Sequence, residues 1–129
     1  MLDSDTVTAL AEKAGGAVYI FEEDAFVQNY RMLIGAFCTL YPSYRLSYSY
    51  KTNYTPYICR IVKELGGYAE VVSDMEYELA RKLGYSSDKI VYNGPTKGAA
   101  LEEHVLSGGI CNLDNFTEAA RIRRIAELN

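Results

Sequence analysis

Hydrophobic positions along this chain follow two spacings, a period of two and a period close to 3.6. Short runs rich in Val, Ile, Tyr and Leu are each followed by a longer segment in which large apolar side chains recur every three or four residues. The short runs are typical of strands and the longer segments of amphipathic helices. The predicted strands lie at residues 18–21, 46–50, 68–72, 89–93 and 110–113.

Residues that favour helix ends stand between these segments. Thr55 followed by Pro56 indicates an N-cap and a proline in the first turn, where its missing N–H is not needed. Two pairs have the spacing of a capping box, Ser73 with Glu76 and Asn115 with Glu118. Glycine accepts the left-handed conformation of a C-cap, and glycines stand where the helices should end: Gly66, Gly84 and Gly108. No linker interrupts the series, so residues 1–129 are predicted to be one domain.

Strand–helix alternation predicts an α/β fold with a parallel sheet and right-handed crossovers. Two architectures fit, an open doubly wound sheet and part of a (β/α) barrel. Small and polar residues on one side of the strands favour a barrel mouth: Ser47, Ser49, Ala69 or Glu70, and Asn93. Neither GxGxxG nor GxxxxGK[ST] follows the first strand. A complete barrel needs eight units and about 250 residues, so this chain corresponds to half a barrel or a fragment.

Composition narrows the partners that this fold can have. The chain has 129 residues, of which 49% are hydrophobic and 23% charged, as in globular proteins. A net charge of −4 disfavours nucleic acid and anionic membranes as partners. No apolar run approaches the roughly 18 residues of a membrane span. The amino terminus has early acidic residues and no apolar core of a signal peptide, so we expect a cytoplasmic protein.

The cysteines and the histidine show no pattern of a metal site. Cys38, Cys59 and Cys111 are odd in number and widely spaced, which predicts buried free thiols in a reducing compartment. The only histidine, His104, lies in LEEHVL among helix-forming residues, where a solvated helix position is expected. No CxxC or HExxH motif is present, so no metal site is predicted.

The stretch RLSYSYK carries the candidate chemistry. With a period of two, Leu46, Tyr48 and Tyr50 fall on one face, and two serines and Lys51 fall on the other. Lys51 therefore ends its strand on the small, hydroxylated face, at the carboxyl end where barrel active sites are built. An amine held in a partly desolvated mouth can attack a carbonyl and form a Schiff base. The alternative is a solvated lysine that leads into a loop.

The segment SYSYKTNYTPYICRIVKELGG resembles the cofactor-lysine region of the alanine racemase-like, or fold type III, pyridoxal phosphate enzymes. Tyr48, Lys51, Thr52 and Asn53 occupy the places of that motif. The resemblance continues through YAEVVSDMEYELARKLG, KIVYNGPTKGAALEEHVLSGG and ICNLDNFTEAARI, which are similar to the second, third and fourth strand–helix units of the family's barrel. Residues 18–37 resemble the strand and helix that precede the barrel. Within the family, the chain resembles the diaminopimelate, ornithine and carboxynorspermidine decarboxylases.

The resemblance implies roles for three residues at the cofactor. Lys51 would hold pyridoxal 5′-phosphate as an internal aldimine, and Ser49 would lie near the cofactor ring. Glu70 stands where the family usually has an aspartate near the lysine.

Further positions match the family without a settled role. Ser73 matches its serine but equally fits a helix cap. Asn93 and Gly94 match the residues at the end of the third strand. Lys97 matches a recurrent lysine, and a solvated residue at a helix start is the alternative.

The resemblance implies decarboxylation of a basic or diamino amino acid, such as diaminopimelate, through a Lys51 Schiff base. Residues 1–129 would be the amino-terminal half of the cofactor-binding barrel. The family's phosphate loop, ring-stacking histidine, acidic partner of the ring nitrogen and β-rich domain are expected farther along, so this chain alone should be inactive. An amino-acid racemase and a non-catalytic half-barrel that binds a cofactor or partner remain alternatives. Open strand edges and uncovered Val72 and Val91 predict a homodimer.

Overall fold

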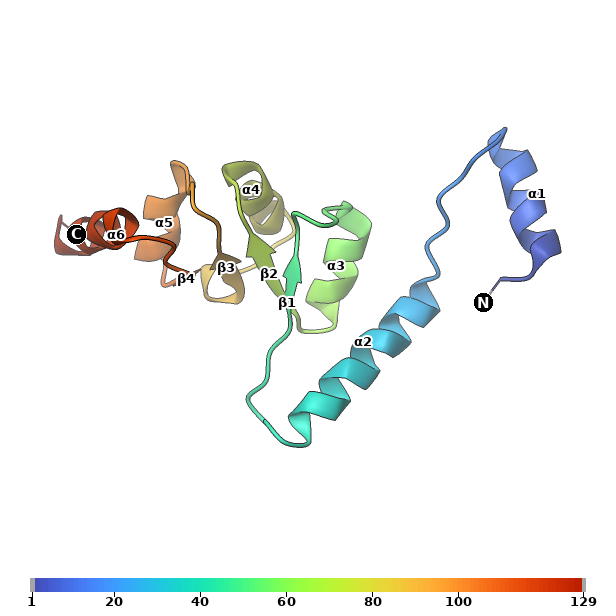
Figure 1. Ribbon diagram of the computed structural model, residues 1–129, viewed down its shortest axis with the longest axis horizontal. Helices are drawn as coiled ribbons and strands as arrows, with labels where there is room; N and C mark the ends of the chain where they lie inside the picture. The colour runs from blue at the N-terminus through green and yellow to red at the C-terminus, as the bar shows by residue number, and fades with distance from the viewer. Residues whose placement is uncertain (1, 129) are drawn as a thin grey trace. The chain divides into compact units, whose positions relative to one another are not determined.

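The computed structural model describes residues 2–128, and the chain divides after Pro42 into two compact units. The described part of the first unit contains helices α1 (Ser4–Ala14) and α2 (Glu23–Cys38) (Figure 1). The carboxylate of Asp3 accepts a hydrogen bond from the N–H of Thr6 at 2.8 Å and caps α1, which ends at Gly15 with φ of 77°. Both helix ends therefore follow from local sequence signals.

The strand predicted at residues 18–21 is wrong. These residues connect α1 to α2 without regular structure, and Tyr19 is fully exposed. A strand needs a neighbouring backbone to satisfy its N–H and C=O groups, and the described residues of this unit offer only helices. The helical pattern that follows is confirmed, because Phe26, Tyr30 and Phe37 all lie within α2.

The second unit alternates strands and helices along its whole length. Its elements are β1 (Ser47–Ser49), α3 (Pro56–Glu64), β2 (Tyr68–Val71), α4 (Asp74–Lys82), the short 3₁₀ helix η1 (Ser87–Lys89), β3 (Ile90–Tyr92), α5 (Ala100–Leu106), β4 (Ile110–Cys111) and α6 (Phe116–Leu128). The described strands form a four-stranded sheet in the order β1-β2-β3-β4, and every pairing is parallel. The prediction of a parallel α/β fold is confirmed.

The register of the strands gives the sheet two different faces. Ser49 pairs with Glu70, Glu70 with Val91, and Val91 with Ile110, so these four residues form one row across the sheet. The next residues along the strands point to the opposite face, because side chains alternate along a strand. That opposite face carries the core, whose buried residues are Tyr50, Cys59, Ala69, Val71, Tyr77, Ala80, Tyr85, Ile90 and Tyr92.

Most predicted helix ends of this unit are confirmed. Pro56 opens α3, although the side chain of Thr55 makes no capping hydrogen bond. Ser73 Oγ accepts the N–H of Glu76 at 3.3 Å, and Asn115 Oδ1 accepts the N–H of Glu118 at 2.9 Å. Left-handed glycines follow three helices, with φ of 85° at Gly66, 83° at Gly84 and 76° at Gly108.

The expectation of a solvated His104 is wrong. Its side chain is fully buried, and its ring packs edge-on against Tyr77 and Tyr92, with centroids 5.4 and 5.8 Å away. Nε2 lies 2.9 Å from the carbonyl oxygen of Ile110, so a hydrogen on Nε2 donates to it. Burial lowers the pKa of His104 below its usual value, and the hydrogen bond to Ile110 offsets part of that effect. The histidine therefore belongs to the core between α4, α5 and β3.

The cysteines are free thiols, as predicted. Cys59 is fully buried, whereas Cys38 and Cys111 are half-buried. Among the described residues no helix is both long and apolar enough to cross a membrane.

Candidate functional site

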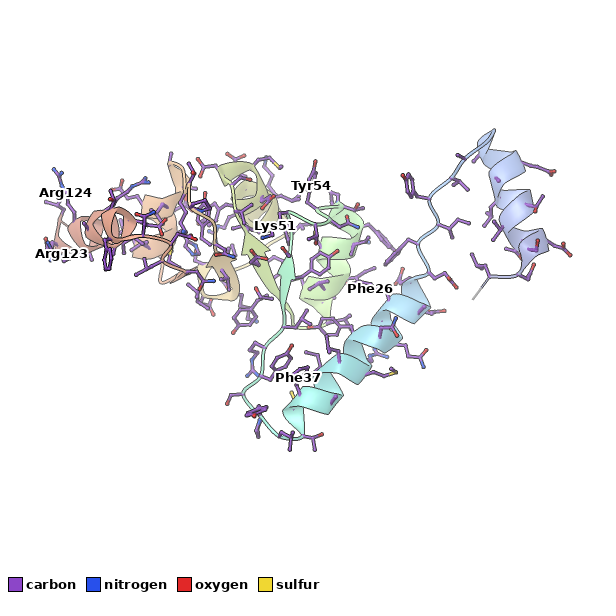
Figure 2. All side chains as sticks on the ribbon, in the orientation of Figure 1. Phe26, Phe37, Lys51, Tyr54, Arg123 and Arg124 are labelled. Atoms are coloured by element: carbon purple, nitrogen blue, oxygen red, sulfur yellow. The ribbon has the colours of Figure 1, made fainter. Side chains whose placement is uncertain are left out.

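Lys51 lies in the turn directly after β1 (Figure 2). The turn is held by Thr52, whose N–H and hydroxyl both donate to the carbonyl oxygen of Ser49, at 3.3 and 2.7 Å. The position at the carboxyl end of a strand is as predicted. The partly desolvated surroundings are not seen, because Lys51 is exposed. Its amine is therefore accessible from solvent at the carboxyl edge of the sheet.

Ser49 lies two residues before Lys51, in the same row as Glu70. Its Oγ is buried and has no hydrogen-bond partner among the described residues. A buried hydroxyl without a partner costs about 1–3 kcal/mol. Ser49 is thus a polar group with an unmet hydrogen bond beside the candidate lysine.

Glu70 and Asn93 form a hydrogen-bonded pair at the ends of β2 and β3. Asn93 Nδ2 donates to Glu70 Oε1 at 2.9 Å, and the backbone N–H of Asn93 donates to the carbonyl oxygen of Val71 at 2.8 Å. Both side chains are half-buried. The sequence indicated both residues separately but not their contact, which depends on the register of two strands.

Ser73 has the helix-cap role that was one of its two interpretations. Its hydroxyl caps α4, and Oε2 of Glu76 accepts the N–H of Val72 at 2.8 Å in return. Gly94 begins the loop after β3 with φ of 88°, and a Cβ at this position would press against the side chain of Val72. The loop therefore needs glycine at this position.

Of the two interpretations of Lys97, the solvated residue at a helix start is wrong. Its side chain is fully buried, and its ammonium lies 2.7 Å from the carbonyl oxygen of Gly94, 2.7 Å from Glu118 Oε1 and 3.3 Å from Asp114 Oδ2. Burial alone would raise the pKa of Glu118, but the hydrogen bonds from Lys97 and from the N–H of Asp114 lower it below its usual value. The carboxylate of Glu118 is thus held in its charged form.

Asp74 is a structural residue that the sequence analysis missed. Its Oδ1 accepts the hydroxyl of Tyr92 at 2.7 Å, and its Oδ2 accepts the N–H of Ala99 at 2.8 Å. Burial opposes ionisation, yet these hydrogen bonds lower the pKa of Asp74. The useful sequence signal is Gly98, because a Cβ at that position would clash with the Asp74 carboxylate.

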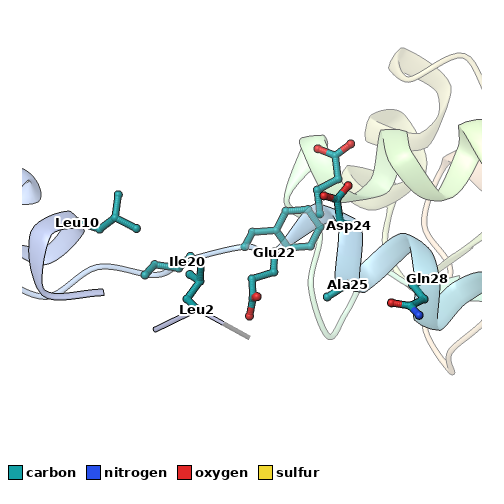
Figure 3. A pocket seen from close by; sticks show the side chains of 9 residues that line it. Leu2, Leu10, Ile20, Glu22, Asp24, Ala25 and Gln28 are labelled. Atoms are coloured by element: carbon teal, nitrogen blue, oxygen red, sulfur yellow. The ribbon is translucent and has the colours of Figure 1, made fainter. Parts of the chain in front are cut away.

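A wide hollow in the first unit is lined by other kinds of side chain than the strand ends around Lys51 (Figure 3). Aliphatic side chains of Leu2, Leu10 and Ile20 line part of it, and acidic side chains of Glu22 and Asp24 line another part. Its lining holds no lysine, cysteine or histidine. We therefore place the candidate site at the carboxyl edge of the sheet, around Lys51, Ser49, Glu70 and Asn93.

Comparison with known proteins identifies the family of this chain. Residues 29–128 match the family described as the pyridoxal binding domain of pyridoxal-dependent decarboxylases. The chain belongs to this family. It is 30% identical over 118 residues to a diaminopimelate decarboxylase of Methanothermobacter thermautotrophicus, covering 91% of this chain and 28% of that protein. It is also 30% identical over 128 residues to an L-glutamyl-[BtrI acyl-carrier protein] decarboxylase of Niallia circulans, covering 98% of this chain and 29% of that protein.

Solved structures of this family confirm the fold. The crystal structure of the Methanocaldococcus jannaschii diaminopimelate decarboxylase superposes with a TM-score of 0.78 at 32% identity, over 92% of this chain and 29% of that one. A lysine decarboxylase from Selenomonas ruminantium superposes with a TM-score of 0.74 at 22% identity, over 97% of this chain and 33% of that one. The sheet thus matches part of the barrel of these enzymes. This chain spans about 28% of the length of the curated relatives that it matches.

Proposed function

We propose that this chain is the amino-terminal, cofactor-binding part of a pyridoxal phosphate-dependent amino-acid decarboxylase. The observation that carries the proposal is the placement of Lys51. Its accessible amine stands at the carboxyl end of β1, next to the unpartnered hydroxyl of Ser49 and to the row that contains Glu70. Membership of the pyridoxal binding domain family supports the same role.

The residues present fit this cofactor on their own chemistry. Lys51 offers the primary amine that would hold the cofactor's aldehyde, and the unmet hydrogen bond of Ser49 Oγ suits a polar group beside it. When bound, pyridoxal phosphate takes up the electron pair that a departing carbon dioxide leaves behind. Asn93 donates to Glu70 Oε1, which leaves Oε2 of this carboxylate available to accept a hydrogen bond from a ligand. The pair thus presents an oriented acceptor near the strand end that carries Lys51.

The substrate is proposed to be a basic or diamino amino acid, with diaminopimelate as the first candidate. Two relatives whose match covers about nine-tenths of this chain are named diaminopimelate decarboxylases. A crystal structure similar to this chain was solved with L-lysine, and another was solved with pyridoxal phosphate and cadaverine. The decarboxylase of Niallia circulans acts on a glutamyl group instead, so substrate choice has to be measured.

The remainder of the proposed enzyme would supply the groups that this chain lacks. The relatives are more than three times as long as the region that matches. The row of Ser49, Glu70, Val91 and Ile110 lies opposite the core face of the sheet. In the longer protein the rest of the barrel would cover this row, and we propose that the assembled enzyme is a homodimer, the simplest closed arrangement of identical chains.

The proposal is tested with the full-length protein that carries this chain. Carbon dioxide release is measured from diaminopimelate, lysine, ornithine and carboxynorspermidine, with and without added pyridoxal phosphate. We expect cofactor-dependent release from one of them, lowered about 1,000-fold or more in Lys51→Ala. Lys82→Ala is the matched control, because Lys82 is an exposed lysine on α4. Racemisation without release of carbon dioxide would favour the racemase. The absence of both reactions would favour a non-catalytic barrel.

A further inference from the structure

We infer that Lys97 is a positioning residue, whose buried ammonium fixes the loop after β3 and thereby holds the Asn93 carboxamide on Glu70. The inference rests on the proposed function, since bound cofactor gives the Asn93–Glu70 pair its role. It concerns residues 93–100, the loop that runs from the end of β3 to the start of α5.

The contacts of Lys97 exclude a direct role in binding or chemistry. An ammonium has three N–H donors, and acceptors stand for all of them at Gly94, Glu118 and Asp114. The side chain is fully buried, so its amine is closed to solvent, in contrast to Lys51. Lys97 can therefore act only through the backbone and the carboxylates that it joins.

Stability alone is a poor explanation for this cluster. The ammonium of Lys97 and the carboxylate of Glu118, which is only 8% exposed, are withdrawn from water here, whereas the side chain of Asp114 keeps 34% exposure. Well-packed apolar side chains of similar volume often stabilise a protein as much as a buried ion pair does. The cluster provides geometry, because an ammonium at 2.7 Å from a particular backbone carbonyl and a particular carboxylate fixes both.

The fixed carbonyl belongs to Gly94, the residue directly after Asn93. The backbone of Asn93 is thus held on both sides, by its own N–H on the carbonyl oxygen of Val71 and by the anchored carbonyl of Gly94. With the backbone fixed, the side chain of Asn93 reaches Oε1 of Glu70 at 2.9 Å. Release of Gly94 would free the backbone from which this carboxamide projects.

The far end of the loop is held separately. Arg121 of α6 donates from Nη1 to the carbonyl oxygen of Lys97 and from Nη2 to that of Gly98, both at 2.9 Å. Asp74 of α4 accepts the N–H groups of Ala99 and Ala100 at 2.8 and 3.2 Å. These contacts leave the Lys97 ammonium as the anchor nearest to Asn93, so its removal should act on the near end of the loop.

The first test uses Lys97→Met, which keeps an unbranched side chain one heavy atom shorter and removes its charge. The double variant Lys97→Met/Glu118→Gln also removes the carboxylate that would be left unpaired, and Lys82→Met is the exposed control. Crystal structures of the cofactor-free full-length proteins measure the distance from Asn93 Nδ2 to Glu70 Oε1. Fluorescence titration measures the dissociation constant for pyridoxal phosphate.

We expect both Lys97 variants to lose the Asn93–Glu70 contact and to bind the cofactor about 10- to 100-fold more weakly, with the control unchanged. A merely structural lysine would lower the unfolding temperature and leave the distance at 2.9 Å and the affinity within twofold, which overturns the inference. If Lys97→Met fails to fold, the double variant decides, since it buries no unpaired carboxylate at Glu118.

A rescue experiment separates the ammonium from the packing of its stem. Lys97→Ala deletes the atoms that propylammonium would replace, so this ion should restore most of the lost cofactor affinity, whereas tetramethylammonium, which has no N–H donor, should not. Equal effects of both ions would contradict the positioning role. Failure of the wild-type protein to bind pyridoxal phosphate would overturn the proposed function instead, and the Asn93–Glu70 distance in the variants would still decide the role of Lys97.

Discussion

The side-chain amide of Asn93 donates to Oε1 of Glu70 at 2.9 Å, which joins the carboxyl ends of two neighbouring parallel strands. This contact lies on the face of the sheet that is turned away from the core, in the row that includes Ser49. An oriented carboxylate at this edge is the kind of group that a cofactor site requires. The candidate site therefore draws on the ends of three strands, with Lys51 after the first.

The Asn93–Glu70 pair should act as a unit in cofactor binding. In the full-length protein we expect Glu70→Ala and Asn93→Ala each to weaken pyridoxal phosphate binding about 10-fold, and the double variant to be little worse than either one. Fluorescence titration of the cofactor measures these losses, with the exposed Glu78→Ala as control. Losses that multiply in the double variant would show that the two residues act independently.

The buried His104 predicts a specific dependence of stability on pH. Its pKa is lowered in the folded state, so the unfolded chain binds the proton more readily. The free energy of unfolding should be at its full value above about pH 6.5 and should fall as pH decreases below that. Around the ring, Glu103 favours the charged form, Arg81 disfavours it, and Tyr77 and Tyr92 exclude water.

Urea unfolding of the full-length protein at pH 7.5 and 5.5 measures this effect. We expect wild type to lose more of its free energy of unfolding than His104→Gln does between these two values. His104 is the only histidine of this chain, so within these residues the comparison isolates one imidazole. Equal losses in both proteins would mean that His104 is protonated without cost in the folded state.

Two glycine substitutions should have opposite effects on stability. Gly98→Ala places a methyl group against the Asp74 carboxylate, which must then give up hydrogen bonds to the loop before α5, at a cost of about 1–3 kcal/mol. Gly35→Ala is the matched control, because Gly35 lies inside α2 with open space around it. This change should stabilise the protein by about 0.5–1 kcal/mol. Chemical denaturation measures both, and a neutral Gly98→Ala would contradict the Asp74 anchor.

The 129-residue chain on its own should self-associate and show no measurable decarboxylase activity. In the described sheet β1 and β4 are the edge strands, each paired on one side only, and Ile110 is 41% exposed on the uncovered row. Light scattering should give a mass of at least twice 14.4 kDa. A monodisperse monomer at high concentration, or turnover of diaminopimelate by this chain, would contradict this expectation.

Local patterns were sufficient to predict most of the fold. Strands β1 to β4 and the helices that follow them lie where period and end signals placed them, because capping residues and left-handed glycines act within a few positions. The strand at residues 18–21 failed for a nonlocal reason. Its apolar composition favours a strand, but strand formation also depends on a neighbour that a local pattern does not contain.

Single residues of the candidate site could be predicted from the sequence. The contacts between side chains far apart in the sequence could not. Lys51, Ser49 and Glu70 were singled out from strand position and family resemblance. The burial of Lys97 was not predictable because its acceptor Glu118 lies 21 positions farther along, on another helix. His104 was misread because its place among helix-forming residues does not show which face of the helix is packed, and here the rings of Tyr77 and Tyr92 cover it.

Chemical trapping at Lys51 tests the central claim most directly. The full-length protein is incubated with pyridoxal phosphate, reduced with borohydride, digested and mapped by mass spectrometry. We expect the pyridoxyl group on Lys51 and its loss in Lys51→Ala, while Lys97, with its amine buried and bonded, stays unmodified. A pyridoxyl group on another lysine of the wild-type protein, with Lys51 unmodified, would contradict the proposed site.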